Sequence, residues 1–546
     1  MFSLSSLFLL VILFVFARFL AWIVHFLVIS PLRDPLRLLA GPEAPLLGSH
    51  LTQIGDPDLS CVAHEEWCRL YGKTFKVQGL GKFDYRLMSF DFRVVSHVLS
   101  SPVYEKPWQA RSLLSTVMGR GIFAMEGPEH HLLKRIIGPA FTSQAVNALT
   151  PFFFQKAEEL RDKWDTLLNM DSTNQRNSVG SPIDISHWIS RATFDSFGLA
   201  CLNYNFNALD GETEDVYLAF RHLFGLVDKK TVLRILFPVL DKLWPDAVAR
   251  SVQKSRDVIY RVGQALVANK KATIYSEKCD HEKDLLSLLI KSNLSSDPSK
   301  RLSDSDLLDQ ITSFLFAGSD STALALTWCL HFLSQHPDIQ TQLREEILQS
   351  PPSPSTMEAF TNDGSFCDAF AGTLPLLDAV VKESLRLCPP THGTLRVATT
   401  DDIIPVSSPV MLQDGTMTEP GQGIHVRKGS FVNIPIEGLN YSREIWGDDA
   451  LEFSPERWFN LPPNARSPVY PGLANVMTFS FGPHACPGYK FTLTEMKTFI
   501  AVLLPHFEFA AIEGQKIGKY NGVLTRPFVK GHLDDGFQLP LRVKRI

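Results

Sequence analysis

The most constraining feature of this chain is one cysteine in a loop of glycine and proline near the C-terminus. The stretch from Phe479 to Lys490 reads FSFGPHACPGYK, and its cysteine is Cys486. A helical pattern of apolar residues follows at once, so the thiol is predicted to lie just before a helix N-terminus. That position favours negative charge and lowers the pKa of a thiol. A thiolate in this setting is a good single ligand for a haem iron. A buried, inert cysteine near a turn is the alternative for an isolated cysteine.

A second stretch places polar groups inside an apolar helix. Residues 307–333 have a helical apolar pattern, which is interrupted by Gly318, Asp320, Ser321 and Thr322. Glycine within a helix costs about 1 kcal/mol relative to alanine, which indicates a gain elsewhere, such as room for a ligand. Buried polar groups need partners, and an acid beside an alcohol can relay protons. The alternative is a hydroxyl that only bonds back to its own helix.

The cysteine loop resembles that of the cytochrome P450 family. Its pattern is the family's F-x-x-G-x-R-x-C-x-G, except that His484 stands at the arginine position. The matching residues are Phe479, Gly482, Cys486 and Gly488. In the family the cysteine is the proximal thiolate of the haem b iron, and the phenylalanine lies near the sulfur. The resemblance therefore implies Cys486 as the metal ligand, with Phe479 and His484 as cofactor-binding residues.

The helix at 307–333 also resembles the family, through the motif A-G-x-D/E-T. In the family this acid–alcohol pair helps to deliver protons to bound dioxygen. Asp320, Ser321 and Thr322 are implied as catalytic residues, with Ser321 at the usual threonine position. Serine keeps the hydroxyl but lacks the methyl group that restricts χ1. We therefore expect less tightly coupled oxygen chemistry rather than its loss.

Two short motifs predict a support for the cysteine loop. Glu383 and Arg386 form an E-x-x-R pair on one helix face, and Arg457 lies in PERW, which is similar to the family's PERF. On its own, E-x-x-R is a weak signal. In the family's order these residues imply a buried ionic cluster with a structural role.

Four basic residues are implied as partners of the haem propionates. His130 and Lys134 fit the register of the family's W-x-x-x-R, although the next register along this helix is also basic. A solvated basic helix face is the alternative. Arg396 stands where the family has an arginine that suits a carboxylate. His484 is a weaker and pH-dependent cation, so we expect haem retention to depend on pH more than usual.

The N-terminus predicts a membrane anchor at residues 1–30. The apolar run 7–29 would span about 35 Å as a helix, enough to cross a bilayer. A cleaved signal peptide is the alternative, but it needs a basic start that this chain lacks. Arg33 and Arg37 follow the run, which places the bulk of the chain in the cytosol. We expect a single-pass protein of the endoplasmic reticulum membrane.

The rest of the chain predicts one large domain. Residues 31–50 form a proline-rich hinge and residues 51–546 the haem domain. The expected fold is mainly α with a small β lobe, the cytochrome P450 fold, preceded by one transmembrane helix. Residues 74–98 read as the β-region. Residues 232–244 are strongly apolar, and the resemblance implies a channel roof that dips into the membrane, although a core helix would look the same.

The composition of the chain limits which classes of partner are expected. The chain has 546 residues, 45% of them hydrophobic, and a formal net charge of -5, so nothing indicates a nucleic-acid partner. Its eight cysteines show no CxxC pair, which is typical of a reducing compartment. No dinucleotide fingerprint is present. Electrons would therefore come from NADPH through a separate reductase, with cytochrome b5 as an optional second partner.

The resemblance implies a haem-thiolate monooxygenase that inserts one oxygen atom into an apolar small molecule, by hydroxylation or epoxidation. The motifs are similar to those of fungal microsomal members of the family, many of which act in secondary metabolism such as terpenoid tailoring. Two alternatives remain. One is a P450-fold isomerase or dehydratase that needs no reductase, and the other is a non-catalytic haem-binding sensor.

Overall fold

The structure is a computed structural model, and it describes most of the chain. The described residues are 29–46, 48–171, 180–211, 214–227, 231–277, 284–295, 301–352, 372–466 and 476–546, with a few isolated positions beyond them. The predicted membrane anchor, residues 1–30, lies almost wholly outside these ranges. Across the part of the chain that is described, no helix is both long enough and apolar enough to cross a membrane.

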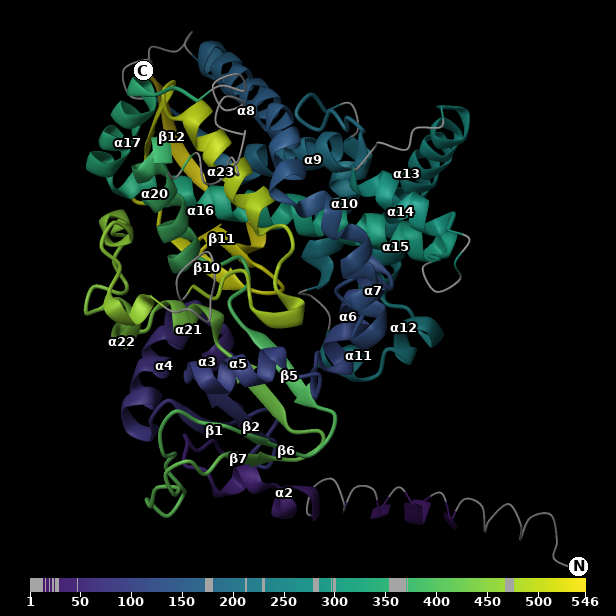
Figure 1. The fold of residues 1–546 in the computed structure, drawn as a ribbon, viewed down its shortest axis with the longest axis vertical. Helices are drawn as coiled ribbons and strands as arrows, with labels where there is room; N and C mark the ends of the chain where they lie inside the picture. Colours follow the sequence, from purple (N-terminus) through teal and green to yellow (C-terminus); the bar gives the residue numbers. More distant parts are fainter. Residues whose placement is uncertain are drawn as a thin grey trace, which may run out of the picture. The chain divides into compact units, whose positions relative to one another are not determined.

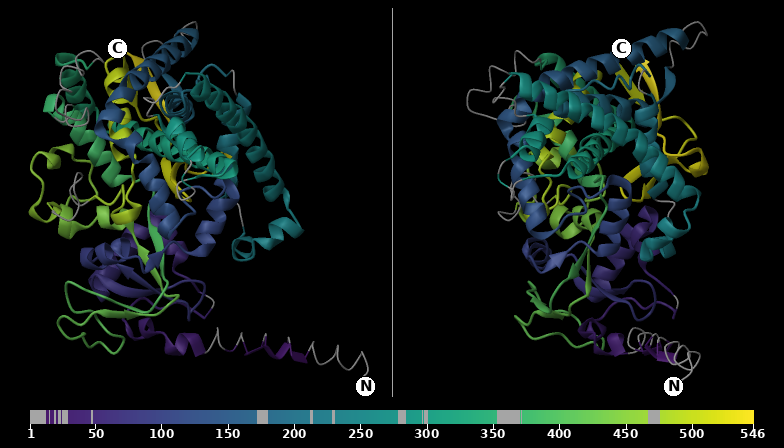
Figure 2. Two further views of the ribbon diagram at one scale, coloured as in Figure 1. Left: turned by 45° about the vertical axis from the view of Figure 1, so that its right-hand side comes forward. Right: turned by 90° about the vertical axis from the view of Figure 1, so that its right-hand side faces the viewer.

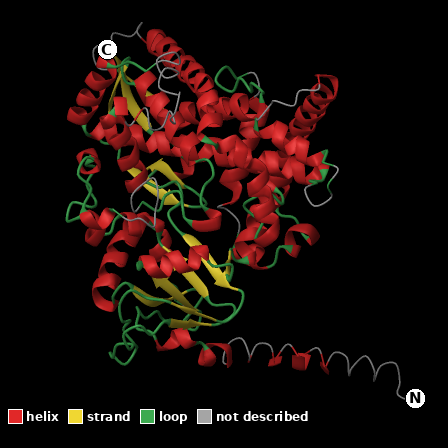
Figure 3. Ribbon diagram, viewed as in Figure 1, coloured by secondary structure: helices red, strands yellow, loops and turns green. Residues whose placement is uncertain are grey.

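The chain divides into two compact units, which are described separately. The smaller unit comprises Met1–Lys106 and Gly393–Gly438, and the larger comprises Pro107–His392 and Leu439–Ile546. Helix dominates the larger unit, whereas the smaller unit carries the largest sheet (Figures 1 and 3).

The smaller unit is built on a five-stranded sheet with the order β1-β2-β8-β5-β3. Only the β2–β8 pair is parallel among these described strands. The strands are β1 (Thr74–Gln78), β2 (Tyr85–Ser89), β3 (Tyr104–Glu105), β5 (Thr394–Ala398) and β8 (Phe431–Ile434), and β6 (Asp402–Ile404) pairs with β7 (Ile424–Val426). The helices are α2 (Ser30–Arg33), α3 (Leu51–Gly55), α4 (Pro57–Tyr71) and α5 (Phe92–Ser100).

The predicted β-region at 74–98 is correct only as far as Ser89. Residues 92–100 form helix α5, whose N-terminus is capped by Asp91, the acceptor from the Arg93 N–H at 2.9 Å. Its buried residues, including Val94 and Val98, recur with helical spacing. Burial of one helix face therefore outweighs the β-propensity of the valines.

The larger unit contains long helices and two small sheets. Its helices are α6 (Trp108–Met118), α7 (Gly127–Ile137), α8 (Ser143–Asp171), α9 (Ile185–Leu202), α10 (Glu214–Val227), α11 (Val232–Leu236), α12 (Val239–Leu243), α13 (Ala247–Glu277), α14 (Leu285–Asn293), α15 (Asp304–Leu315), α16 (Ser321–Gln335), α17 (Pro337–Gln349), α20 (Pro375–Leu387), α22 (Arg443–Trp446) and α23 (Tyr489–Leu503). Helix α21 (Ile436–Asn440) spans the boundary between the units. The sheets are β4-β12-β9 (Ser181–Asp184, Pro540–Arg545, Phe507–Ala510) and the hairpin β10-β11 (Ile517–Asn521, Thr525–Val529).

Helices α9, α16 and α23 lie together at the centre of the larger unit (Figures 1 and 2). The predicted helix at 307–333 is present as α15 and α16, joined by a π-helical turn at Phe316–Asp320. Single π turns within helices are frequent at functional sites. The space beside Gly318 is taken by protein rather than by a ligand, because an added Cβ would meet the Phe197 ring at 2.0 Å. The glycine thus lets α9 approach the turn.

The apolar stretch 232–244 forms two short helices, α11 and α12, instead of a core helix. Five of its large side chains are more than half exposed: Leu233, Phe237, Val239, Leu243 and Trp244. Arg234 closes the pair by bonding to Asp241 at 2.8 Å and to Asp246 at 2.8 Å. The stretch is therefore a folded surface element with an apolar face.

Candidate active site

The cysteine loop has a defined backbone shape. Ser480 and Gly482 have positive φ values of 57° and 70°, and the turn at Gly482–His484 is a short 3-10 helix. The Cys486 N–H donates to the Phe479 carbonyl at 2.9 Å and closes the loop. Helix α23 starts three residues later, as the sequence predicts. The loop thus holds the cysteine beside a helix N-terminus.

The Cys486 side chain is partly exposed, but the protein surrounds the sulfur closely enough for loss of solvation to decide its ionisation in the protein alone. Burial raises the pKa of Cys486, while the Gly488 N–H and the Lys134 charge lower it in part. The lowered pKa that the sequence predicts is therefore not the net result. The free-energy cost of removing a thiolate from water is larger than the stabilisation that one N–H donor and one nearby ammonium group provide. A bound metal cation would reverse this balance, since a coordinating thiol is deprotonated.

Two of the predicted basic residues lie against the cysteine loop. The His130 ring is buried and its centroid lies 4.2 Å from that of His484. The ammonium group of Lys134 donates to the carbonyls of Pro483 at 2.6 Å and Ala485 at 2.9 Å. The residues of the neighbouring register, His131 and Arg135, are exposed. Of the two possible registers along this helix, the one with His130 and Lys134 therefore faces the cysteine loop.

His484 has a partner that the sequence did not reveal. Its Nε2 lies 2.8 Å from Oε2 of Glu126, and the Glu126 side chain is 5% exposed. Glu126 precedes α7, so the helix that carries His130 and Lys134 also supplies this carboxylate. An acid far away in the sequence carries no local signal for such a pairing. The role of these residues towards haem propionates remains a prediction.

Arg396 lies in the smaller unit. It lies on β5, is 4% exposed, and donates to the Thr394 hydroxyl at 2.6 Å. It also donates to the Leu395 carbonyl at 3.0 Å. Its predicted role on a propionate stays a prediction.

The predicted ionic cluster is confirmed. Glu383 and Arg386 on α20 form two bonds, at 2.8 and 2.9 Å, with both side chains fully buried. Arg457 donates to Glu383 at 2.9 Å. Trp458 also donates to Glu383, through Nε1 at 2.9 Å. One buried carboxylate thus accepts from three side chains, so removal of any member leaves charge or donors unpaired.

Asn440 connects this cluster to the cysteine loop. Its amide donates to the Arg386 carbonyl and to the Thr478 hydroxyl, both at 3.1 Å. Its carbonyl accepts from the Met477 N–H at 2.9 Å. Because Met477 and Thr478 directly precede Phe479, the position of the loop depends on the cluster. Sequence reasoning missed Asn440, since its role rests on contacts distant in the chain.

Asp320 lies at the end of the π turn and is held by an arginine. Arg526 of β11 donates to its two carboxylate oxygens at 2.5 and 3.3 Å, and both side chains are 10% exposed. A planar guanidinium suits this two-point contact. The sequence predicted the acid but not this cation, which lies 206 residues away.

The hydroxyls of Ser321 and Thr322 have different surroundings. Ser321 bonds to the Ala317 carbonyl within the π turn. Thr322 is fully buried, and its hydroxyl lies 3.3 Å from that of Thr492 on α23. Between positions 310 and 331, only Ala317, Gly318 and Ser321 are not buried. Ser321 therefore belongs to the accessible face of this helix, and Thr322 connects the helix to α23.

Comparison with known proteins identifies the family. A sequence model of the cytochrome P450 family matches residues 40–528. The chain belongs to the cytochrome P450 family. Cytochrome P450 monooxygenase 128 from Postia placenta is 37% identical over 97% of this chain and 97% of its own. The ganoderic acid synthetase of Ganoderma lucidum is 29% identical, over 91% and 92%. This P450 is therefore an oxidoreductase of the monooxygenase family, and relatives from fungi are among its matches.

A solved cytochrome P450 shares the fold. The comparison gives a TM-score of 0.68 at 23% identity, and covers 93% of this chain and all of the other. The fold predicted from the sequence, mainly helical with small sheets, is thereby confirmed for the described residues.

The residues of this P450 fit the haem that the family implies. Every residue from 478 to 490 is half-exposed, although the loop follows buried segments and leads into a buried helix. The Cys486 thiol faces one N–H donor and one ammonium group, which suits an anionic ligand atom. Cys486 would hold the iron, with His484 in the same loop and with His130 and Lys134 of α7 in contact with that loop.

Proposed function

We propose that this P450 inserts one oxygen atom from O2 into an apolar small molecule, by hydroxylation or epoxidation. The observation that carries the proposal is the retained acid–alcohol pair, with Ser321 on the accessible face of the helix and Asp320 held beside it. The haem, when bound through Cys486, supplies the oxygen-activating chemistry. The protein supplies the proton path and the position of the thiolate.

The proton path uses Asp320, the last residue of the π turn, and Ser321, the first residue of α16. The lone pairs of the Ser321 hydroxyl can accept a hydrogen bond, while its own hydrogen is donated to the Ala317 carbonyl. To relay a proton, the hydroxyl turns this hydrogen away from Ala317 and gives it up as it takes another on a lone pair. Asp320 is the acid that exchanges protons with solvent, and Arg526 keeps the carboxylate in place while it is charged. Release of one oxygen from the guanidinium would let the carboxylate turn towards the serine.

We place the substrate in fungal secondary metabolism, for example in terpenoid tailoring. Support comes from the relatives, among them an enzyme named for ganoderic acid synthesis. We further propose NADPH-cytochrome P450 reductase as electron donor, docking near the Cys486 loop, with cytochrome b5 as an optional partner.

We propose a single-pass location in the endoplasmic reticulum membrane, with the catalytic units in the cytosol. Support comes from the apolar sequence 7–29, followed by Arg33 and Arg37. The exposed apolar side chains of α11 and α12 offer a second contact with lipid.

The test is turnover under 18O2 with added reductase and NADPH, on a panel of terpenoids and fatty acids. We expect products that carry one 18O atom and that depend on the reductase. Rearrangement of a hydroperoxide without NADPH would identify an isomerase or dehydratase instead. A correctly loaded protein that turns over nothing in either assay would favour the sensor.

A further inference from the structure

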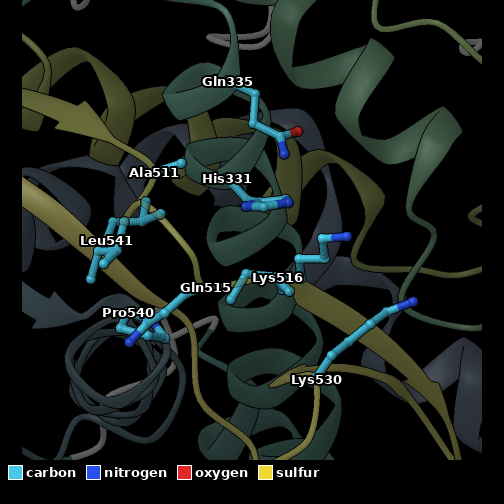
Figure 4. A pocket seen from close by; sticks show the side chains of 10 residues that line it. His331, Gln335, Ala511, Gln515, Lys516, Lys530, Pro540 and Leu541 are labelled. Carbon is cyan, nitrogen blue, oxygen red and sulfur yellow. The ribbon is translucent and has the colours of Figure 1, made fainter.

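Polar groups gather at the end of α16 and along α7 in the larger unit. The end of α16 lines a pocket of about 270 Å³, together with residues that lie beside β10, β11 and β12 (Figure 4). Neither α7 nor the cysteine loop contributes to the wall of this pocket. The contacts of α7 lead instead to the loop that carries Cys486, the predicted iron ligand.

One face of α7 and its N-cap residue contacts the cysteine loop at each turn. Glu126, His130 and Lys134 are spaced four residues apart, so they lie on the same face. Glu126 pairs with His484, and 2.8 Å separates its Oε2 from the histidine Nε2. The His130 ring lies against the same histidine, with ring centroids 4.2 Å apart. The third residue of this face, Lys134, reaches the backbone of the loop.

Lys134 fixes the peptide group in front of the cysteine. Its ammonium group donates to the Pro483 carbonyl at 2.6 Å and to the Ala485 carbonyl at 2.9 Å. The second carbonyl belongs to the peptide group that joins Ala485 to Cys486. The N–H of the same peptide group donates to the Phe479 carbonyl at 2.9 Å. Because a peptide group is planar, holding it from both sides fixes the direction in which the Cys486 side chain leaves the backbone.

These bonds also determine what Lys134 can do for a bound haem. An ammonium group has three N–H donors, and two of them are used by the loop, so at most one remains for a propionate. Both acceptors are neutral carbonyls, so the bonds leave the positive charge of Lys134 uncancelled. A positive charge beside the iron ligand stabilises the electron that reduction adds to the haem, and the net charge around such a centre is one of the factors that set its potential.

We propose that Lys134 is a positioning residue for the Cys486 thiolate. It holds the peptide group in front of the cysteine and places a positive charge beside the iron ligand, which raises the reduction potential of the bound haem. The family resemblance implies a different partner for Lys134, a haem propionate. The proposal rests on haem ligation by Cys486 and is independent of the reaction that the enzyme carries out.

The test uses the haem-loaded, full-length protein and measures the midpoint potential of the iron by redox titration. Lys134→Met removes the charge and both hydrogen bonds but keeps an apolar side chain of similar length. We expect it to weaken the reduction equilibrium about ten-fold, which corresponds to about 59 mV for one electron. The matched control, Arg135→Met, removes the same charge from the next residue of α7, which is exposed, and should keep the wild-type potential. An unchanged potential in Lys134→Met, or an equal decrease in both variants, would overturn the proposal.

Two further variants separate the charge from the hydrogen bonds. Lys134→Arg keeps both the charge and the N–H donors, so its potential should be close to that of the wild type. Lys134→Gln keeps N–H donors without the charge and should have a lowered potential, and it takes the place of Lys134→Met if that variant does not retain haem. An equal decrease in the arginine and glutamine variants would contradict a role for the charge.

Resonance Raman spectra of the same proteins distinguish a loop contact from a propionate contact. We expect Lys134→Met to shift the iron–sulfur stretching band and Arg135→Met to leave it in place. A change confined to the bending bands of the propionates would assign Lys134 to a propionate and overturn the proposal. A wild-type spectrum without an iron–sulfur band would overturn both the ligation by Cys486 and the proposal. Since the spectra need no substrate, their outcome does not depend on the monooxygenase reaction proposed above.

Discussion

Ser321 and Thr322 are adjacent in the chain, yet their hydroxyls have different environments. The sequence left open which of them serves oxygen activation. Ser321 is the first residue of α16 and lies on its accessible face, whereas Thr322 is buried against Thr492. We infer that Ser321 carries the chemistry and that Thr322 positions α16 against α23.

The two hydroxyls can be separated by substitution. Ser321→Ala should lower the yield of oxygenated product per NADPH consumed by about ten-fold or more, since a positioned proton donor contributes roughly 10²–10⁴-fold. Thr322→Val should leave this ratio close to wild type and lower the melting temperature slightly. The reverse pattern, with uncoupling in Thr322→Val alone, would contradict the assignment. Product and NADPH are measured in the same reaction.

Glu495 on α23 is a fully buried carboxyl group. Burial raises its pKa to about 8, and the neighbouring Ser196 hydroxyl lowers it only in part. The folded protein therefore holds an extra proton between the usual glutamate pKa of 4.5 and about 8. Stability should fall as the pH rises through this window, by an amount on the order of 3–5 kcal/mol.

Glu495→Gln should abolish this dependence. The variant should melt above the wild type at pH 8 and close to it at pH 5, when melting is followed across the pH range. Glu508→Gln, whose parent side chain is half-exposed on β9, serves as the control and should not change the profile. Parallel profiles for wild type and Glu495→Gln would show that the carboxyl group is charged in the folded protein.

At the scale of elements, the connection from α20 to the cysteine loop passes through Asn440. Asn440→Ala removes partners of Arg386, Met477 and Thr478, and each group left unpaired costs about 1–3 kcal/mol. We expect lower thermal stability and less retained haem after gel filtration. Asn464→Ala, an exposed asparagine in the same unit, is the matched control. Full haem retention in Asn440→Ala would mean that the loop is held by other contacts.

The approach of α9 to the π turn rests on Gly318. Gly318→Ala would push a methyl group into the Phe197 ring and should destabilise the fold by about 1–3 kcal/mol. The same change made in a Phe197→Leu background should cost less, because the smaller side chain can yield. A double-mutant cycle in denaturant measures the coupling. Additive effects would show that the two residues do not contact each other.

At the scale of the whole molecule, the features that could be predicted from the sequence are those that short motifs determine. The loop around Cys486, the helix that follows it and the cluster of Glu383, Arg386 and Arg457 were all predicted before the structure. Each of these depends on spacing within about ten residues or on a family motif. The mainly helical fold with small sheets followed from the same resemblance and is confirmed.

What escaped prediction depends on contacts between distant segments. Arg526 on Asp320, Glu126 on His484 and Asn440 beneath the loop join residues far apart in the chain. No local pattern marks such a partner. Helix α5 was read as strand, because β-branched residues and burial on one face give conflicting signals. The membrane anchor and the propionate contacts remain predictions.

The central claim is that the Cys486 thiolate is the iron ligand of this P450. The reduced carbon monoxide difference spectrum of the membrane fraction tests it most directly, for wild type, Cys486→Ala and the control Cys201→Ala, a buried cysteine on α9. We predict a strongly red-shifted Soret band in the wild type and the control, and its loss in Cys486→Ala. A wild-type spectrum typical of histidine-ligated haem, or a red-shifted band that survives in Cys486→Ala, would contradict the account.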